Sequence, residues 1–326
     1  MKLLTLFLSI SMFPILGNVG TESTSPTLYI QELFKVAKGP HFWVSVHAME
    51  YLAKLGLKKE ARKLALSNLK AFQDTPEKRI GYWRVQSMAA KRKLQRIYWT
   101  RKIKKAYLTK SSPDRIHAAE SLAKLGISFK KFNQAIVLKD LNSEGMLFSF
   151  CNWAYSLPKD VNELPDYSAL MKEISNKNLQ RRSLAAYAFG FLKTNMSKDS
   201  WDTLATFALK EDPNSTAYVR LIFAAYVHYN DLNRESLDTF IDVRERLLRL
   251  ENSPKKSERM ELCLALAQSS LEHDLPIIER VLFSITTPTD HSSAKSMPLD
   301  SDDKEFLDLK AAASYAYLKL QSTINK

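Results

Sequence analysis

The sequence predicts an all-α protein, an open α-solenoid of about seven or eight helix pairs. Three observations lead to this prediction. The phrase "VHAMEYLAKLGL" at residues 46–57 returns as "IHAAESLAKLGI" at residues 116–127. Apolar segments recur at intervals of roughly 33 to 50 residues, the period of two-helix repeats. Only 8 of the 326 residues are glycine, and no stretch alternates with period two long enough to require a sheet.

Each interval holds one strongly apolar segment, which we assign to the second helix of a pair. A single pair cannot bury both of its faces, but a stack of pairs can. HEAT-like repeats are favoured over TPR repeats, because the W…LG…Y…P spacing of TPR is absent. The apolar segments lie at Val46, Trp83, Ile116, Phe150, Leu184, Val219, Leu262 and, less clearly, Ala311. Preceding helices fit residues 58–72, 94–109, 129–139, 161–175, 198–211 and 235–250.

Proline and glycine mark the ends of these helices. A proline at the first helical position loses no hydrogen bond, because that N–H has no partner within the helix. Gly56 and Gly126 close the two matching helices, where a left-handed residue is needed. Prolines fall just before several second helices, at positions Pro40, Pro76, Pro113, Pro213 and Pro254.

The beginning of the chain predicts export. An apolar run from Leu3 to Leu16 follows Lys2 and is too short to span a bilayer comfortably. We therefore expect a signal peptide over residues 1–20, the alternative being a buried first helix, and a periplasmic or secreted protein without a transmembrane segment. The solenoid then covers residues 21–326, with an exposed loop at 286–302 before a closing helix.

Several functions are excluded by missing motifs. No GxGxxG, GxxxxGK or GxSxG string occurs, which removes most nucleotide-dependent and α/β-hydrolase functions. No CxxC or HExxH occurs either, so we expect neither a metal nor a cofactor. Cys151 and Cys263 are predicted to stay unbonded, since they lie about three repeats apart, roughly 27 Å at the usual spacing of helix layers.

The repeated phrase contains a His and a Glu in both copies. His47 and Glu50, like His117 and Glu120, are three residues apart and share a helix face. The two helices are two repeats apart, roughly 20 Å, which argues against one shared metal site. We expect each His to bond the neighbouring repeat while its Glu orients it, the alternatives being contact with a ligand or a metal.

The segment after the first copy combines rings with cations. Arg79, Tyr82, Trp83 and Arg84 lie in "KRIGYWRVQSMAAKRK", next to the helix that contains Trp43. Sugar rings stack on Trp and Tyr, and Arg binds carboxylates or sulfates in a bidentate manner. These residues are candidate ligand contacts, although Trp83 can equally belong to the core and the arginines to salt bridges between repeats.

A basic stretch follows, with twelve Lys or Arg and no Asp or Glu between Lys78 and Pro113. It accounts for nearly all of the net charge of +13. Lys102, Lys104 and Lys105 lie at its centre and are further candidates for binding. Because export makes nucleic acid improbable, we expect an acidic polysaccharide, an acidic partner or an anionic membrane surface, or else a solvated basic face.

These motifs resemble a family of bacterial HEAT-like proteins. Its members have a W-x-x-V-H-A-A-E-x-L-x-x-L-G helix followed by an R-I-G-x-W-R-V helix. They occur free and exported, or fused to sulfatases and sodium–solute symporters, in loci that degrade complex and often sulfated polysaccharides. The resemblance covers roughly residues 40–127, with Met49 in place of the usual Ala. The matching residues are Trp43, Val46, His47, Ala48, Glu50, Leu52, Leu55, Gly56, Arg79, Ile80, Gly81, Trp83, Arg84 and Val85.

The resemblance implies a genomic association and no catalytic residues. We therefore expect a non-catalytic exported protein that assists the degradation of an acidic or sulfated glycan, such as ulvan. It would bind the glycan or a partner enzyme, a sulfatase or a lyase. The alternative is a helical-toroid enzyme, such as a uronic-acid lyase using His47 or His117 with a Tyr and an Arg. A closed ring would favour the enzyme, because it brings the first and last helix pairs together.

Overall fold

A computed structural model describes residues 26–160, 162–192, 196–229, 236–269, 271–286 and 303–324. Within these ranges the regular structure is entirely helical, so the all-α prediction is confirmed. The predicted signal peptide at 1–20 lies outside the described residues. So does the predicted loop at 286–302, apart from Thr286, which ends a helix.

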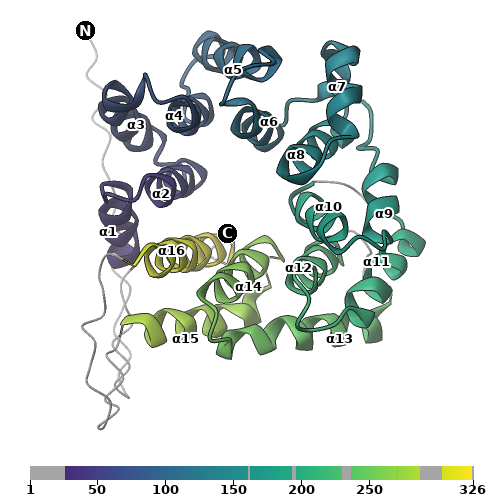
Figure 1. Ribbon diagram of the computed structural model, residues 1–326. Helices are drawn as coiled ribbons and strands as arrows, with labels where there is room; N and C mark the ends of the chain where they lie inside the picture. Colours follow the sequence, from purple (N-terminus) through teal and green to yellow (C-terminus); the bar gives the residue numbers. More distant parts are fainter. Residues whose placement is uncertain are drawn as a thin grey trace, which may run out of the picture.

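The described helices form two concentric layers (Figure 1). Even-numbered helices line the inner side of a ring, and odd-numbered helices cover its outer side. The inner helices are α2 (Phe42–Lys54), α4 (Pro76–Met88), α6 (Arg115–Lys124), α8 (Gly145–Ser156), α10 (Leu179–Phe191), α12 (Tyr218–His228), α14 (Lys256–Ser269) and α16 (Lys304–Ile324). The outer helices are α1 (Pro26–Ala37), α3 (Lys58–Phe72), α5 (Lys93–Leu108), α7 (Gln134–Leu141), α9 (Ser168–Ile174), α11 (Lys198–Lys210), α13 (Leu237–Leu248) and α15 (Leu275–Thr286).

The helix positions agree closely with the sequence-based assignment. Each apolar segment assigned to a second helix lies in or borders an inner helix, and the helix predicted at 58–72 is α3. Two outer helices, α1 and α15, were not predicted. The helix predicted at 161–175 begins only at Ser168, because Pro165 restricts the residue before it to extended backbone.

The glycines of the repeated phrase end their helices as expected. Gly56 has φ +92° and Gly126 has φ +72°, both in the left-handed region. After α2, the N–H of Leu57 donates to the carbonyl of Leu52, and the N–H of Gly56 donates to that of Ala53. The same pair of bonds follows α6, so both copies end in a Schellman motif that satisfies the last carbonyls.

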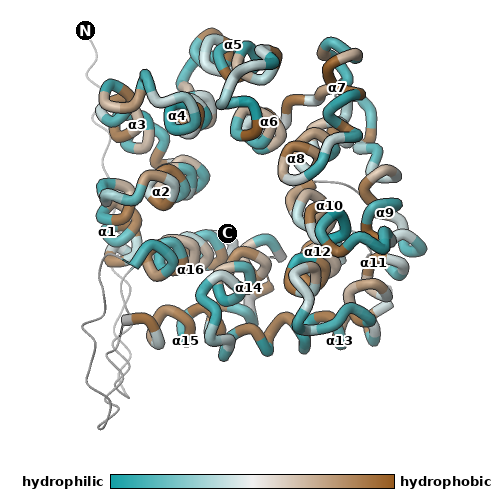
Figure 2. The backbone as a smooth tube through the Cα atoms, in the orientation of Figure 1, coloured by the Kyte–Doolittle hydropathy of each residue, from teal (hydrophilic) through white to brown (hydrophobic). Residues whose placement is uncertain are grey.

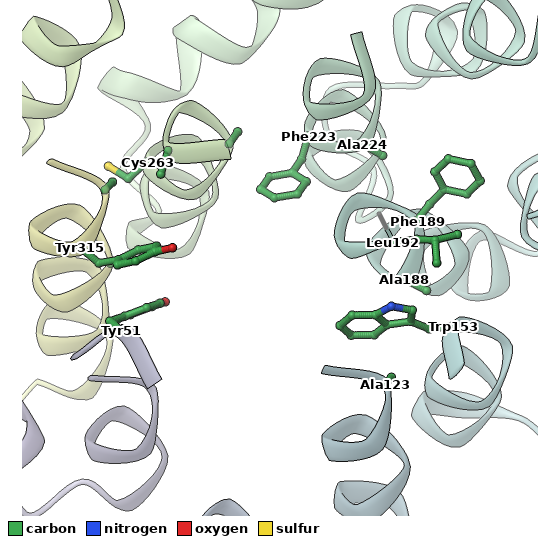
Figure 3. Packing of buried hydrophobic residues seen from close by; sticks show 14 of the residues in the cluster. Tyr51, Ala123, Trp153, Ala188, Phe189, Leu192, Phe223, Ala224, Cys263 and Tyr315 are labelled. Carbon is green, nitrogen blue, oxygen red and sulfur yellow. The ribbon is translucent and has the colours of Figure 1, made fainter. Parts of the chain in front are cut away.

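The solenoid closes into a ring, so the prediction of an open solenoid is wrong. Helix α16 packs against α1 and α2, at the other end of the chain (Figure 1). The rings of Tyr51 and Tyr315 stack with centroids 4.6 Å apart, as Figure 3 shows. Lys310 Nζ lies 2.8 Å from a carboxylate oxygen of Glu32. The eight described helix pairs complete one turn, which corresponds to an average rotation of about 45° per pair.

The layers are joined by a continuous apolar core. Apolar residues from inner and outer helices alike are fully buried, including Leu33, Met49, Phe129 and Trp201. Hydrophobic and hydrophilic residues follow one another along most helices, whereas α15 is mostly hydrophobic (Figure 2). No helix among the described residues has the length and apolarity that a membrane span requires.

Cys151 in α8 and Cys263 in α14 are both buried and both free. The prediction that they do not pair is confirmed. Each thiol is enclosed within the wall of the ring, at separate inner helices.

Candidate functional site

The two copies of the repeated phrase meet at one arginine. Arg84 lies in α4, between α2 and α6, and its side chain is completely buried. Its guanidinium lies 2.5 Å from Glu50 Oε1 and 3.4 Å from Glu120 Oε2. It also donates to Ser121 Oγ at 3.1 Å. We call Glu50, Arg84, Glu120 and Lys124 the bridging cluster, because Lys124 Nζ lies 2.7 Å from Glu120 Oε1.

The two copies of the phrase were expected to lie too far apart to share a site, but their side chains meet at Arg84. Helix α4 lies between their helices, but side chains of both copies contact Arg84 of α4. The ring of Trp43 in α2 lies 4.6 Å from the ring of His117 in α6. The repeated Glu therefore serves packing between repeats, since both copies neutralise the same guanidinium.

The charges of the bridging cluster are held in their ionised forms. Burial alone would raise the pKa of Glu50, but Arg84 and then Lys124 outweigh it, and the pKa is lowered. Burial would likewise raise the pKa of Glu120, yet Lys124 and Arg84 place it well below its usual value. The pKa of Arg84 is raised, because the two carboxylates outweigh its desolvation. The cluster is consequently a buried, charge-balanced network.

The two repeated histidines have different surroundings. His47 Nδ1 lies 3.1 Å from Asp308 Oδ1. This contact joins α2 to α16 at the seam of the ring, which is where the first and last helices meet. The ring of His117 contacts that of Trp43 at an angle of 36°, and its Nδ1 lies 4.0 Å from Glu120 Oε2. About a third of each histidine side chain is exposed. In the described part of the chain, no three His, Cys, Asp or Glu side chains gather as metal ligands would.

The other aromatic and arginine candidates divide between core and surface. Tyr82 is buried among Phe42 and Phe72, and burial raises its pKa to about 12. Arg79 donates through Nε and Nη2 to Asp114 Oδ2 at 2.9 and 2.7 Å, which is the predicted salt bridge between repeats. Its guanidinium carbon also lies 5.3 Å from the centre of Trp83, which is half-buried. Tyr82 is therefore structural, and Trp83 lies at the edge of the surface.

The basic stretch forms α5 on the outside of the ring. Six of the sixteen residues of α5 are Lys or Arg and none is acidic. Lys102 Nζ lies 5.1 to 5.2 Å from the ring centres of Tyr98, Trp99 and Trp83. Lys104 Nζ lies 4.2 Å from the ring centre of Phe132, and Lys105 is exposed. The outer patch is the surface formed by Trp83, Lys93, Tyr98, Trp99, Arg101, Lys102, Lys104 and Lys105.

The cations of the outer patch differ from the arginines of α4. Arg79 and Arg84 are paired with carboxylates. In contrast, the Lys and Arg residues of the outer patch form no ion pair with any described residue. Half of the Tyr98 surface is exposed beside them. A hollow of about 280 Å³ adjoins Trp99 and is lined also by Gln86, Gln95 and Arg62. This surface combines free positive charge, aromatic rings and amide groups.

Three further residues of the ring interior were missed by the sequence analysis. Asp308, in the last helix, is the partner of His47. Lys54 and Lys124 occupy the same place in the two copies of the phrase, seven residues after the His. That spacing continues the helix face of the His and the Glu, so the signal was present in the repeat. Asp308 had no comparable signal, because its role depends on closure of the ring.

No protein-family model matches this chain, and a search of curated proteins also returns no match.

Proposed function

We propose that this exported protein binds an acidic polysaccharide, sulfated or rich in uronic acid, through the outer patch and so assists its degradation. The single observation that supports this most is the group of unpaired cations around Tyr98 and Trp99. A structural role for these cations would place carboxylates beside them, as it does for Arg79 and Arg84.

The chemistry of the outer patch suits such a ligand. Sugar rings present C–H faces that pack on exposed aromatic rings, while sulfates and carboxylates attract Lys and Arg. The hollow beside Trp99 adds the amides of Gln86 and Gln95, which are of the kind that bond hydroxyl groups. Export, as the sequence predicts, leaves extracellular polyanions as the available ligands. The family resemblance at residues 40–127 agrees, because its members accompany enzymes that degrade sulfated glycans, of which ulvan is one.

Affinity electrophoresis tests this proposal directly. The protein is run in gels that contain dextran sulfate, alginate or neutral dextran. We expect retardation by one or both of the acidic polymers, none by dextran, and weakening with salt, since exposed charges are screened over about 8 Å at physiological ionic strength. Retardation should be lost when Lys102, Lys104 and Lys105 are changed to Glu.

A charge-matched control separates a site from general attraction. Lys172, Lys177 and Lys210 are exposed and lie in or beside α9 and α11, on a different side of the ring from α5 (Figure 1). Changing these three to Glu alters the net charge equally and should leave most of the retardation. Tyr98→Ala with Trp99→Ala should weaken it severalfold at unchanged charge. Equal losses in both triple variants, or no loss in either, would remove the outer patch from the proposal and leave a partner enzyme as the ligand.

The closed ring supports a second candidate, a lyase that acts on uronic acids. Such a reaction needs a base for the C5 proton and a cation near the carboxylate. The side chain of His47 is about a third exposed, and Asp308 lies where an orienting carboxylate would be placed. The unsaturated product of β-elimination absorbs ultraviolet light, so incubation with alginate or ulvan tests this candidate. Absorbance that grows with time and disappears in His47→Ala would replace the non-catalytic function with the enzyme.

A further inference from the structure

A basic pocket lies where the inner helices α2, α4 and α6 come to an end. It is open to solvent and has a volume of about 390 Å³, within the range of about 300 to 1,000 Å³ typical of small-molecule sites. Lys54, Ser87 and Lys124 come from the ends of the three inner helices, and Lys58 and Arg96 come from α3 and α5. No Asp or Glu lines it. The basic pocket is the site lined by Lys54, Lys58, Ser87, Arg96 and Lys124.

The positive charge of the basic pocket is only partly neutralised. Lys124 is paired with Glu120, and Arg96 donates through Nη2 to the carbonyl of Leu125 at 3.2 Å. Lys54 and Lys58 have no carboxylate within ion-pair distance anywhere in the described part of the chain. Two cations thus face the pocket without a counter-charge.

Helix dipoles favour two of the four cations of the basic pocket and disfavour the other two. Lys54 and Lys124 lie in the last turns of α2 and α6, where the negative end of the helix favours a cation. Lys58 and Arg96 lie in the first turns of α3 and α5, where the positive end disfavours one. Cations at helix N-termini are unfavourable for folding, yet both of these cations line the same pocket.

The surroundings of Lys54 also favour an anion in the basic pocket. Lys54 is exposed to solvent, and its Nζ lies 5.7 and 5.6 Å from the ring centres of Tyr51 and Tyr315. Its pKa is lowered to about 8, chiefly by desolvation, with Glu50 acting in the opposite direction. Lys124, Lys319 and Arg84 repel its charge and lower the pKa further. An anion in the basic pocket would relieve that repulsion.

We propose that the basic pocket binds a tetrahedral oxyanion, a sulfate or phosphate group, either free or carried by a molecule of monosaccharide size. The ammonium groups of Lys54 and Lys58 would supply the charge, and the remaining N–H groups of Arg96 would supply directed hydrogen bonds. Ser87 lines the pocket too, but its hydroxyl already lies 3.0 Å from Thr100 Oγ1. The five residues of the site do not belong to the outer patch, although Ala90 lines both the basic pocket and the hollow beside Trp99. The proposal does not depend on the proposed glycan function.

Isothermal titration calorimetry at constant ionic strength tests the site, with the full chain and inorganic sulfate, inorganic phosphate or chloride as titrant. Saturable binding of sulfate or phosphate, and none of chloride, is expected. Lys58→Met should weaken it about tenfold, the loss of one charge-assisted hydrogen bond. Lys59→Met is the matched control, since Lys59 is the next residue of α3, is exposed and does not line the pocket.

The remaining titrations distinguish the sources of the anion and the two proposals. Glucose 6-sulfate or glucose 6-phosphate binding tighter than the inorganic anion supports a sugar-borne group, and equal affinity supports a free anion. Tyr98→Ala with Trp99→Ala should leave sulfate binding unchanged, even if it abolishes retardation by polysaccharide. The proposal is overturned if neither anion binds saturably up to about 10 mM, or if Lys58→Met and Lys59→Met bind with equal affinity.

Discussion

The imidazole of His47, in the second helix of the ring, lies 3.1 Å from the carboxylate of Asp308, 261 residues later in the last helix. The same seam contains the stacked rings of Tyr51 and Tyr315. These contacts join the two ends of the chain, so closure of the ring rests on a small number of identifiable side chains.

The first prediction concerns this seam. His47→Ala, Asp308→Ala and the double variant should give a coupling energy of about 0.5–1.5 kcal/mol in urea unfolding, because the pair is partly buried. Lys131 and Asp160 provide a control, since that pair is mostly exposed and its coupling should be near zero. His117→Ala should also lower the melting temperature, through lost contact with Trp43. Equal coupling in both pairs would show that the seam contributes no more than a surface ion pair.

The second prediction concerns the bridging cluster. Arg84→Met leaves Glu50 and Glu120 buried without their shared guanidinium, which should lower the free energy of unfolding by about 3 kcal/mol or more. Lys124 still neutralises Glu120, so the larger penalty falls on Glu50. Arg84→Met combined with Glu50→Met should therefore recover part of the loss. A double variant less stable than Arg84→Met would contradict this account.

The third prediction is a pH dependence that arises at Glu261. Burial raises its pKa to about 7, while Arg220 lowers it and Asp308 raises it further. In the unfolded chain the carboxyl ionises near its usual pKa of about 4.3, so between about pH 4.5 and 7 the folded protein binds more protons. The contribution of Glu261 to stability consequently falls over that window and is constant above it.

Glu261→Gln removes this titration. As pH rises from about 4.5 to 7, the free energy of unfolding of the variant should increase relative to that of the wild type. Above pH 7 the difference should be about 1–3 kcal/mol. Urea unfolding at several pH values measures the difference. A constant difference from pH 4 to 8 would show that the carboxyl has its ordinary pKa.

The fourth prediction concerns close packing of α10 on α12. A Cβ on Gly190 would lie 2.5 and 2.8 Å from two ring carbons of Phe223. Gly190→Ala should therefore lower stability by about 1–3 kcal/mol, despite the better helix propensity of alanine. Phe223→Leu added to Gly190→Ala should be less harmful than the sum of the two single changes. Additive losses would show that the helices adjust without this contact.

The fifth prediction concerns the two thiols. Burial raises the pKa of Cys151 and of Cys263 to about 12 in each case. Because only the thiolate is nucleophilic, neither should react with a thiol reagent in the native protein. Both should react after unfolding in urea. Rapid labelling of the native protein at one site would show that the wall opens there.

The sequence alone determined most of the helices and their order, but not the outer helices α1 and α15. Periodicity reports which face of each segment is buried, and that information is local. It placed the inner helices, the ends at Gly56 and Gly126, and the separation of Cys151 from Cys263. The repeated phrase also contained the spacing of Lys54 and Lys124, which went unused.

Only the tertiary structure decided that the solenoid closes. Closure depends on a small rotation at each pair that accumulates over the whole chain, and no local pattern records it. Arg84, in the helix between the two copies, reaches both Glu50 and Glu120, although those helices were expected to lie roughly 20 Å apart. The meeting of His47 with Asp308 follows from closure.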